Sequence, residues 1–483
     1  QKVKGSKNDS VFNTKIDKFL NLQKLKIINY YYKDNYNYNL NETRFDNLKV
    51  QSFKTLFYYI LKRLSFLNSI LGYKGKIFLL HETFFIRETV MSLFKYGYSF
   101  KIIRPLTVKK KDLALNDINI PGLKKIFFQF LNKLLGSQKE KKECKNFLYR
   151  EFIQYISYHL AYQTVWREFL LNQKEKPKAI MSGYPKDYIY TSLREASSEF
   201  NIPIITYQHA VTPEIINECF FEHNKSVTDS CFSDYFFCFN KASKKYYENK
   251  YSVAKCIPTG LPQEISNQVI CPFTKKRSKH LTYVSSNLYA GNVNSVVQKG
   301  IIDYDIAKEE IELFDKVFSK LSHKIYFQSY PKAPRYIDPD PIIEFLKKIK
   351  NTEILDKNKD LKFLRTQPTI FVSKNMTSSI GYLLLSGRPI IFLNYMSQFI
   401  RKELRNKFKE ILFFFDEKEK NFFQNVKNFL KQPLELIDNE WEKKRKKRKK
   451  FISNYLGSND GKAGERAAKL INQYTILNNN LVN

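Results

Sequence analysis

Short apolar runs alternate with helical stretches between about residues 74 and 240. Runs of this length with turn residues at their ends are typical of buried parallel strands in βαβ units. Between them, apolar residues recur every three or four positions, as on one face of a helix. This pattern predicts a first α/β domain, with strands at Lys76–Leu80, Phe100–Ile103, Ala179–Met181, Ile202–Tyr207 and Tyr235–Phe239.

A second series of the same kind starts near residue 280. The segment Pro258–Pro272 separates the two series, and its three prolines, one glycine and polar composition are typical of an interdomain linker. We therefore expect two doubly wound domains that face a cleft, with ligands beyond the carboxyl ends of the strands. The expected strands of the second domain are Leu281–Val284, Lys324–Phe327, Thr369–Val372, Pro389–Leu393 and Ile411–Phe415.

The first 70 residues contain no clear strand. Apolar positions such as Phe53, Leu56, Phe57 and Ile60 have helical spacing, which predicts a helical N-terminal region. The predicted organisation is a helical region at 1–72, a first Rossmann-like domain at 73–262, a second at 273–450 and a terminal segment at 451–483.

The chain of 483 residues carries 82 Lys and Arg against 47 Asp and Glu, a net charge of +35. Such a balance indicates a polyanionic neighbour: nucleic acid, an anionic membrane face or a phosphorylated substrate. The run Lys443–Lys450 is entirely basic and suits an anionic membrane surface. Nucleic-acid binding and a simple solvated helix face are the alternatives for this run.

Other bulk features exclude several classes of protein. There is no apolar run of about 18 residues, so we expect no spanning helix, and the polar first ten residues do not resemble a secretory signal. The six cysteines form no CxxC pair and the six histidines no HExxH motif. This predicts reduced thiols, no metal site and a cytoplasmic protein, peripheral at the inner membrane face if the basic run binds lipid.

Three segments of the first half carry a family resemblance. They are Pro177–Ala210 (PKAIMSGYPKDYIYTSLREASSEFNIPIITYQHA), Ser233–Asn240 (SDYFFCFN) and Thr259–Pro262 (TGLP). Together they resemble the first domain of GT-B-fold glycosyltransferases that build bacterial surface polysaccharides such as capsule, lipopolysaccharide and teichoic acid. In that family a strand ends in Gln-His-Gly, whereas Ala210 replaces the glycine here.

Two segments of the second half extend the resemblance to about residues 75–470. They are Ser373–Asn394 (SKNMTSSIGYLLLSGRPIIFLN), similar to the donor-site element, and Tyr455–Arg466 (YLGSNDGKAGER). The latter tail also occurs in glycerophosphotransferases that use CDP-glycerol. The family's His-Pro-Arg element is represented by Tyr330–Arg335, which lacks the histidine.

The resemblance implies a GT-B-like fold, with an acceptor domain followed by a nucleotide-sugar domain and a terminal helix that crosses back. It also implies that the residues Asp460, Lys462 and Arg466 serve mainly to bridge the domains. The implied reaction moves a sugar from a nucleotide-activated donor, used as substrate, to a lipid-linked or glycan acceptor. The resemblance implies no metal ion, and we expect no other cofactor.

The donor's phosphates need stabilisation as they leave. Thr377, Ser378 and Ser379 follow a strand and open the helix Ile380–Leu385, where free N–H groups and hydroxyls favour an anion. Simple N-capping is the alternative. Lys332 and Arg335 could contact the same phosphates, or be ordinary solvated charges.

Ser285, Ser286 and Asn287 follow the first strand of the second domain. This position favours contact with the nucleotide or its phosphates, and an ordinary turn is the alternative.

The acceptor hydroxyl needs a base. His209 ends a strand next to Gln208 and could accept a proton or bind substrate, and Glu214 could orient or replace it. Glu82, after the first strand, is a second candidate base. A structural role for His209 and a salt bridge between Glu82 and Arg87 are the alternatives.

Three other functions remain open. A polyol-phosphate transferase would use the same phosphate site but attack phosphorus, and an inactive GT-B partner would explain the two departures from the family pattern. A nucleic-acid-binding protein would use the charge together with 32 Tyr and 41 Phe. Because no nucleic-acid-binding motif is present, we expect no specific nucleic-acid partner.

Overall fold

A computed structural model describes most of the chain after residue 71. The described residues are 58, 61–62, 70, 72–103, 106, 108, 122–134, 138–183, 187–209, 214–215, 230, 232–248, 253–266, 277–285, 303–329, 341–355, 361–364, 367–374, 378–394 and 400–480. The predicted helical region at 1–72 therefore lies almost wholly outside the described residues.

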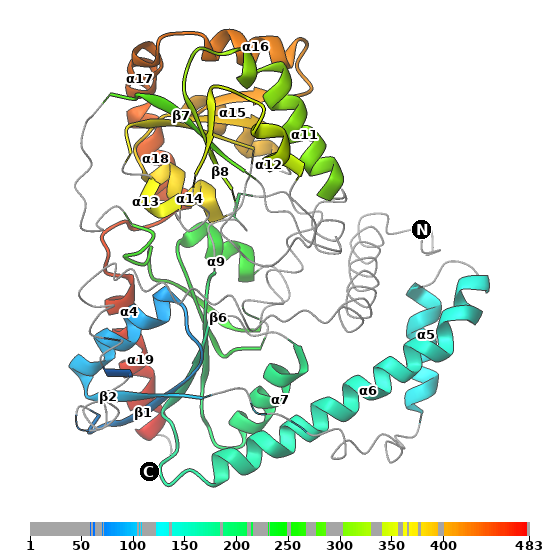
Figure 1. Ribbon diagram of the computed structural model, residues 1–483. Coiled ribbons are helices and arrows are strands. Elements are labelled where there is room, and N and C mark those ends of the chain that lie inside the picture. Colours follow the sequence, from blue (N-terminus) through cyan, green and yellow to red (C-terminus); the bar gives the residue numbers. More distant parts are fainter. Residues whose placement is uncertain are drawn as a thin grey trace.

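The first domain is a parallel six-stranded sheet with strand order β2-β1-β3-β4-β5-β6 (Figure 1). Its strands are β1 (Gly75–His81), β2 (Tyr98–Ile102), β3 (Ala179–Ser182), β4 (Ile204–Tyr207), β5 (Tyr235–Cys238) and β6 (Lys255–Pro258). Its helices are α4 (Phe84–Leu93), η1 (Phe94–Tyr96), α5 (Leu123–Leu134), α6 (Gln138–Leu171), α7 (Asp187–Ser198) and α9 (Lys241–Glu248). The order reverses between β1 and β3, where ligands of doubly wound sheets bind.

The second domain is a second parallel six-stranded sheet, ordered β12-β11-β10-β7-β8-β9. The strands are β7 (His280–Val284), β8 (Ile325–Gln328), β9 (Thr352–Ile354), β10 (Thr369–Ser373), β11 (Ile390–Asn394) and β12 (Phe413–Asp416). The chain runs outward from β7 to β9, then returns to β10 on the other side of β7 and continues to β12. The order thus reverses between β7 and β10, as in other doubly wound sheets.

Helices surround this second sheet (Figure 1). They are α11 (Asp303–Lys316), η3 (Phe318–Lys320), α12 (Pro341–Leu346), α13 (Leu361–Leu364), α14 (Ser378–Leu385), α15 (Lys402–Ile411), α16 (Phe422–Leu430), α17 (Leu434–Lys443) and α18 (Arg445–Tyr455). The prediction of two doubly wound α/β domains is confirmed. The predicted domain boundaries stay predictions, and the one after residue 450 falls inside α18.

Two strands were not predicted. β6 and β9 stand at the outer ends of the two sheets, and each has only one neighbouring strand. Their residues are less buried than those of the inner strands, so neither carries an apolar run: β9 reads Thr-Glu-Ile and β6 reads Lys-Cys-Ile-Pro. An inner strand such as β11 is buried at all five positions. Its sequence is therefore a nearly continuous apolar run, which predicts a strand.

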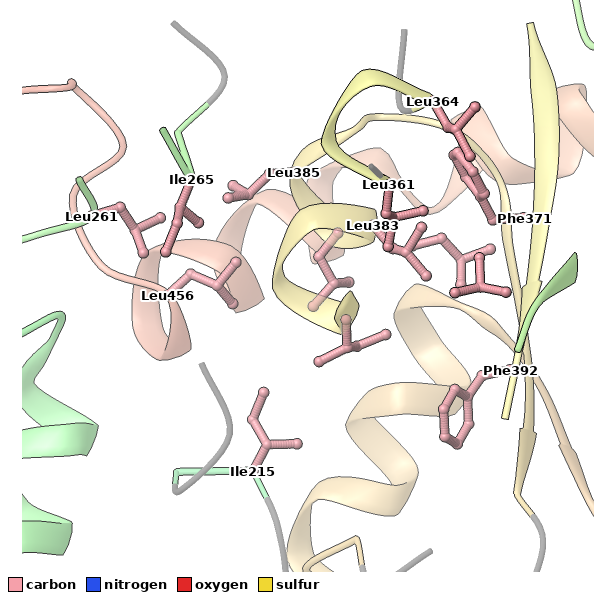
Figure 2. Close-up of a cluster of buried hydrophobic side chains, with 14 of the residues drawn as sticks. Ile215, Leu261, Ile265, Leu361, Leu364, Phe371, Leu383, Leu385, Phe392 and Leu456 are labelled. Carbon is pink, nitrogen blue, oxygen red and sulfur yellow. The ribbon is translucent and has the colours of Figure 1, made fainter. Parts of the chain in front are cut away.

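The hydrophobic core continues from one domain into the other. Ile215, Leu261 and Ile265 of the first half belong to the same buried cluster as Leu385 of α14 and Leu456 after α18. Figure 2 shows Leu456 next to Leu261 and Ile265 of the first half. This shared apolar packing holds the two domains against each other.

The chain returns to the first domain at its C-terminal end. α19 (Ala463–Asn480) packs along α4, and in Figure 1 the red helix lies beside the blue one. The Tyr98 hydroxyl lies 2.6 Å from the Thr475 hydroxyl, and the Tyr235 and Tyr474 rings stack at 4.3 Å. The predicted C-terminal bridging helix is therefore confirmed.

Arg466 fixes the start of this returning helix. Its guanidinium donates two hydrogen bonds to the Asp460 carboxylate, at 2.7 and 2.9 Å, and a third to the Thr259 carbonyl. The bonds from Arg466 lower the pKa of Asp460 to about 2. Gly260 has a φ of +94° and a Cβ there would meet the Arg466 guanidinium. The hydrogen bonds of Arg466 thus connect the segment Thr259–Pro262 with the segment Asp460–Arg466.

Gly464→Val should weaken the contact between α19 and α4. A Cβ at residue 464 would lie 2.7 Å from the Glu88 backbone carbon, and backbone cannot move aside as a flexible side chain can. We expect the free energy of unfolding to fall by about 1–3 kcal/mol, measured by urea unfolding. Gln473→Val, at an exposed position of α19, is the control and should change it far less. Equal losses in the two variants would contradict this packing.

Candidate functional site

The strands of both sheets end at the interface between the domains. The backbone N–H of Arg401, which follows β11, donates to the carbonyl of Ile215, which follows β4, at 3.2 Å. The Arg401 guanidinium also lies over the Tyr246 ring of α9, 5.6 Å from its centroid. These contacts join segments that follow the carboxyl ends of strands in both sheets. Because all strands of a parallel sheet end at the same edge, the carboxyl edges of the two sheets face each other.

A buried polar network lies at the carboxyl ends of β4 and β5. The Gln208 side-chain carbonyl accepts from the Phe239 N–H at 2.9 Å, and its amide lies 3.3 Å from a Glu214 carboxyl oxygen. The Asn240 amide donates to the other Glu214 oxygen at 3.1 Å and to the Tyr455 carbonyl of α18 at 2.7 Å. The structure therefore brings together Gln208 and Glu214 of the predicted site, and links them to the second domain through Asn240.

Asn240 was not among the predicted site residues. It ends the Ser233–Asn240 segment, and a polar residue directly after a buried strand is the signal that could have identified it. Its partners come from residues 26 and 215 positions away, which no local pattern reveals.

Glu214 has an altered acidity. Burial raises the pKa of its carboxyl to about 7, although hydrogen bonds from Asn240, Ser243 and Gln208 oppose the shift. A carboxyl group with a pKa near neutrality can take or give a proton under physiological conditions. Glu214 is therefore the residue of this network with the acid–base properties that a transfer reaction needs.

The other two predicted bases follow strands of the first sheet. His209 directly follows Gln208, and its side chain is exposed at the end of β4. Glu82 follows β1 and forms ion pairs with Lys62 at 2.8 Å and Arg87 at 4.0 Å. The salt bridge considered as the alternative for Glu82 is thus present, and its role as a base stays a prediction.

A second polar cluster lies at the carboxyl ends of β7 and β10, beside the reversal point of the second sheet. The Lys374 ammonium, 1% exposed, lies 2.8 Å from a Glu309 carboxylate oxygen and 3.9 Å from one of Glu310. The hydroxyls of Ser285 and Tyr283 donate to Glu310 at 2.7 and 3.2 Å. A buried lysine requires such partners because its charge is costly to remove from water.

The sequence indicated Ser285 but not Lys374. Lys374 directly follows β10 and precedes the predicted phosphate-binding serines, so its position was a usable signal. The two glutamates lie far before it in the sequence, on α11, and only the fold brings them together.

The predicted donor site is described only in part. Ser378 opens α14 and Ser379 is half-buried in its first turn. Because α14 follows β10, its N-terminal end lies at the carboxyl edge of the sheet, where helix N–H groups favour an anion. The other predicted donor-site residues, Ser286, Asn287, Lys332, Arg335 and Thr377, lie outside the described residues.

The basic run Lys443–Lys450 spans the end of α17 and the start of α18. Arg448 is buried over the Trp441 ring at 3.7 Å and donates to the Trp441 carbonyl. Lys447 pairs with Glu410 at 3.4 Å, and Lys444 donates to the Lys409 carbonyl at 2.8 Å. A large part of this run therefore stabilises the packing of α18 within the second domain.

Three further observations concern membranes, metals and hollows. No helix in the described part of the chain has the length and apolar character needed to cross a membrane. Among the same residues, no group of three metal-ligating side chains lies close enough to hold an ion. A surface hollow of about 680 Å³ lies between α11 and the start of α16, and none of its lining residues was predicted as part of the site.

Comparisons with known proteins give distant similarity. No protein-family model and no curated protein matches the sequence. Among solved structures, a UDP-glucosyltransferase from Polygonum tinctorium capable of glucosylating indoxyl is 8% identical, with 83% of this chain and 98% of that chain covered and a TM-score of 0.43. MnaA of S. aureus, solved with UDP, is 13% identical, with 83% and 97% covered and a TM-score of 0.44.

A third similar structure is the UDP-GlcNAc 2-epimerase from Neisseria meningitidis bound to UDP-GlcNAc. It is 13% identical, with 84% of this chain and 99% of that chain covered and a TM-score of 0.42. Similarity at this level does not assign an activity or a ligand to the chain.

Glu214 should make stability depend on pH. Below about pH 4.5 its carboxyl is protonated in the folded and the unfolded chain alike. As the pH rises toward 7, the unfolded chain releases the proton first, so ionisation favours unfolding and the wild type loses stability. The glutamine of Glu214→Gln cannot titrate, so the variant does not lose this stability. Between about pH 5 and about pH 8, the unfolding free energy of the variant should therefore rise by about 2–4 kcal/mol relative to that of the wild type.

The measurement is urea unfolding of both proteins at about pH 5 and about pH 8. Glu248→Gln, at an exposed glutamate of α9, is the control and should show no such shift. A difference between wild type and Glu214→Gln that stays constant with pH would contradict the buried, protonated state of Glu214.

Proposed function

We propose that the chain is a glycosyltransferase, which moves a sugar from a nucleotide-activated donor to an acceptor hydroxyl. The observation that carries the proposal is the second domain's strand order, which reverses between β7 and β10. Doubly wound sheets of this order bind nucleotides beyond the carboxyl ends of the strands at the reversal. Ser285, Lys374 and the N-terminal end of α14 lie there.

The donor half of the site follows from this placement. The first turn of α14, with Thr377, Ser378 and Ser379, would bind the leaving phosphates through N–H groups and hydroxyls. Lys332 and Arg335 would add positive charge, and Ser285, Ser286 and Asn287 would contact the nucleotide. Lys374 forms an ion pair with Glu309 of α11. It would therefore anchor the end of β10 to α11 and would not bind phosphate itself.

The acceptor half uses the network of the first domain. In the reaction, the bond between the sugar's anomeric carbon and the donor phosphate breaks, and the acceptor oxygen forms a new bond to that carbon. The acceptor's proton goes to a base, for which exposed His209 is the first candidate and Glu82 the second. Glu214, with a pKa near 7, would orient Gln208 or receive the proton in its place.

The finer parts of the proposal rest on the sequence resemblance. The acceptor would be a lipid-linked molecule or a glycan in the assembly of a bacterial surface polysaccharide, and catalysis would need no metal ion. The enzyme would work in the cytoplasm at the inner membrane face. A membrane contact through the basic run Lys443–Lys450 stays a prediction, because Lys444, Lys447 and Arg448 already have partners within the second domain.

A nucleotide sugar should stabilise the folded chain. We expect one of the CMP-, CDP-, UDP- and GDP-sugars to raise the unfolding temperature at saturating concentration, because a ligand that binds only the folded state stabilises it. Ser379→Ala should reduce this shift, and Ser198→Ala, on α7 of the first domain, should not. The proposal fails if none of the four classes stabilises the chain, and CDP-glycerol as the only stabilising compound would indicate a polyol-phosphate transferase.

His209→Ala tests the acceptor half. With the stabilising donor and its acceptor, we expect the rate of transfer to fall about 10²–10⁴-fold while donor binding stays unchanged. His323→Ala, in the second domain beside Gln432, is the control and should keep the wild-type rate. Transfer by His209→Ala at the wild-type rate would show that the base lies elsewhere.

A further inference from the structure

A helical arm extends from the first domain. α6 has 34 residues and is therefore about 51 Å long. Its C-terminal part is buried in the first domain, where Tyr162, Trp166 and Leu170 pack with Leu193 of α7. Figure 1 shows the rest of α6 extending away from both sheets, with α5 at its outer end. The arm is defined here as residues 122–155.

One face of α5 packs on α6. The Phe127 ring stacks on Phe152 at 4.5 Å and lies 5.5 Å from Tyr149, and Phe128 lies 5.5 Å from Tyr149 as well. These ring contacts hold α5 in a fixed orientation on the arm.

The outward side of α5 combines apolar and basic residues. Ile126 is 63% exposed and Lys125 beside it is exposed too. Lys124 is also exposed, but its ammonium lies over the Phe128 and Tyr149 rings, 5.9 and 5.7 Å from their centroids. Eight large hydrophobic residues are exposed in the described part of the chain, and four of them lie on α5 and α6: Ile126, Tyr155, Leu160 and Leu171. Ile126 and Tyr155 belong to the arm, whereas Leu160 and Leu171 lie on the part of α6 that packs on the first domain.

The charge of the arm identifies what could cover this surface. Residues 122–155 contain eight Lys and Arg against three Glu. A second copy of the chain would bring two arms of the same sign together, which is unfavourable. Nucleic acid would satisfy the lysines but would leave Ile126 exposed. A membrane with anionic phospholipids accommodates the lysines as well as Ile126. Its headgroups pair with lysines, and apolar side chains enter the layer below the headgroups.

We infer that the α5–α6 arm binds the surface of membranes that contain anionic phospholipids. α5 lies in the headgroup region, with Ile126 directed into the acyl boundary and Lys124 and Lys125 at the phosphates. The arm is separate from the basic run Lys443–Lys450, in which Arg448, Lys447 and Lys444 are held by the second domain. The inference does not depend on sugar transfer, so either can fail without the other.

Vesicle flotation of the full chain tests the inference. The vesicles contain phosphatidylcholine with or without about one third phosphatidylglycerol, at about 0.1 M salt. The wild type should float only with the anionic vesicles. Lys124→Glu/Lys125→Glu should bind them at least about tenfold more weakly, because each lysine near an anionic surface contributes about fivefold to affinity. Lys446→Glu/Lys449→Glu makes the same change of charge on α18 and should bind like the wild type.

A second pair of variants separates apolar insertion from charge. Ile126→Ser should weaken binding several-fold, whereas Leu436→Ser, at a 50% exposed leucine of α17, should not. Circular dichroism of each variant serves to check that it is folded. The inference is overturned if the wild type does not float, if both α5 variants bind like the wild type, or if only the α18 variant loses binding. Self-association that the α5 variants abolish, with no flotation, would identify a second copy as the occupant instead.

Discussion

Both parallel sheets end their strands at one shared interface, and the proposed site depends on this constraint. The backbone hydrogen bond from Arg401 to Ile215 joins the two carboxyl edges, and Ile215 belongs to the same buried apolar cluster as Leu261 and Leu456. The hydrogen bonds of Arg466 to Thr259 and Asp460 then fix the start of α19, which returns to α4. With the sheets held in this way, a nucleotide on the second domain would face the Gln208–Glu214 network of the first.

The sequence predicted the ten buried strands because each is a continuous apolar run, and it predicted the crossing helix from a family motif. It missed β6 and β9 because these two end strands bury few side chains and carry no such run, unlike the end strands β2 and β12. It also located Gln208, Glu214 and Ser285 at strand ends, but not Lys374 or Asn240. The partners of Lys374 come from α11 and those of Asn240 from α18, and pairings over such distances are set by the fold alone.

The positive charge has several separate roles. Part of the basic run on α17 and α18 is structural, as the buried Arg448 over Trp441 shows. Lys374 is buried between two glutamates at the carboxyl edge of the second sheet. The lysines of α5 are instead exposed beside Ile126 at the end of a long helix. A basic side chain therefore indicates a binding partner only where it is exposed and does not stabilise the fold.

The most direct test of the proposed site is a crystal structure of the chain with the most stabilising nucleotide sugar bound. The diphosphate should lie at the first turn of α14, within hydrogen-bonding distance of the Ser379 N–H or hydroxyl, with the nucleoside beside Ser285 at the end of β7. The sugar should point across the interface toward His209 and Gln208. A nucleotide bound instead in the hollow between α11 and α16, or only at the first domain, would contradict the proposed function.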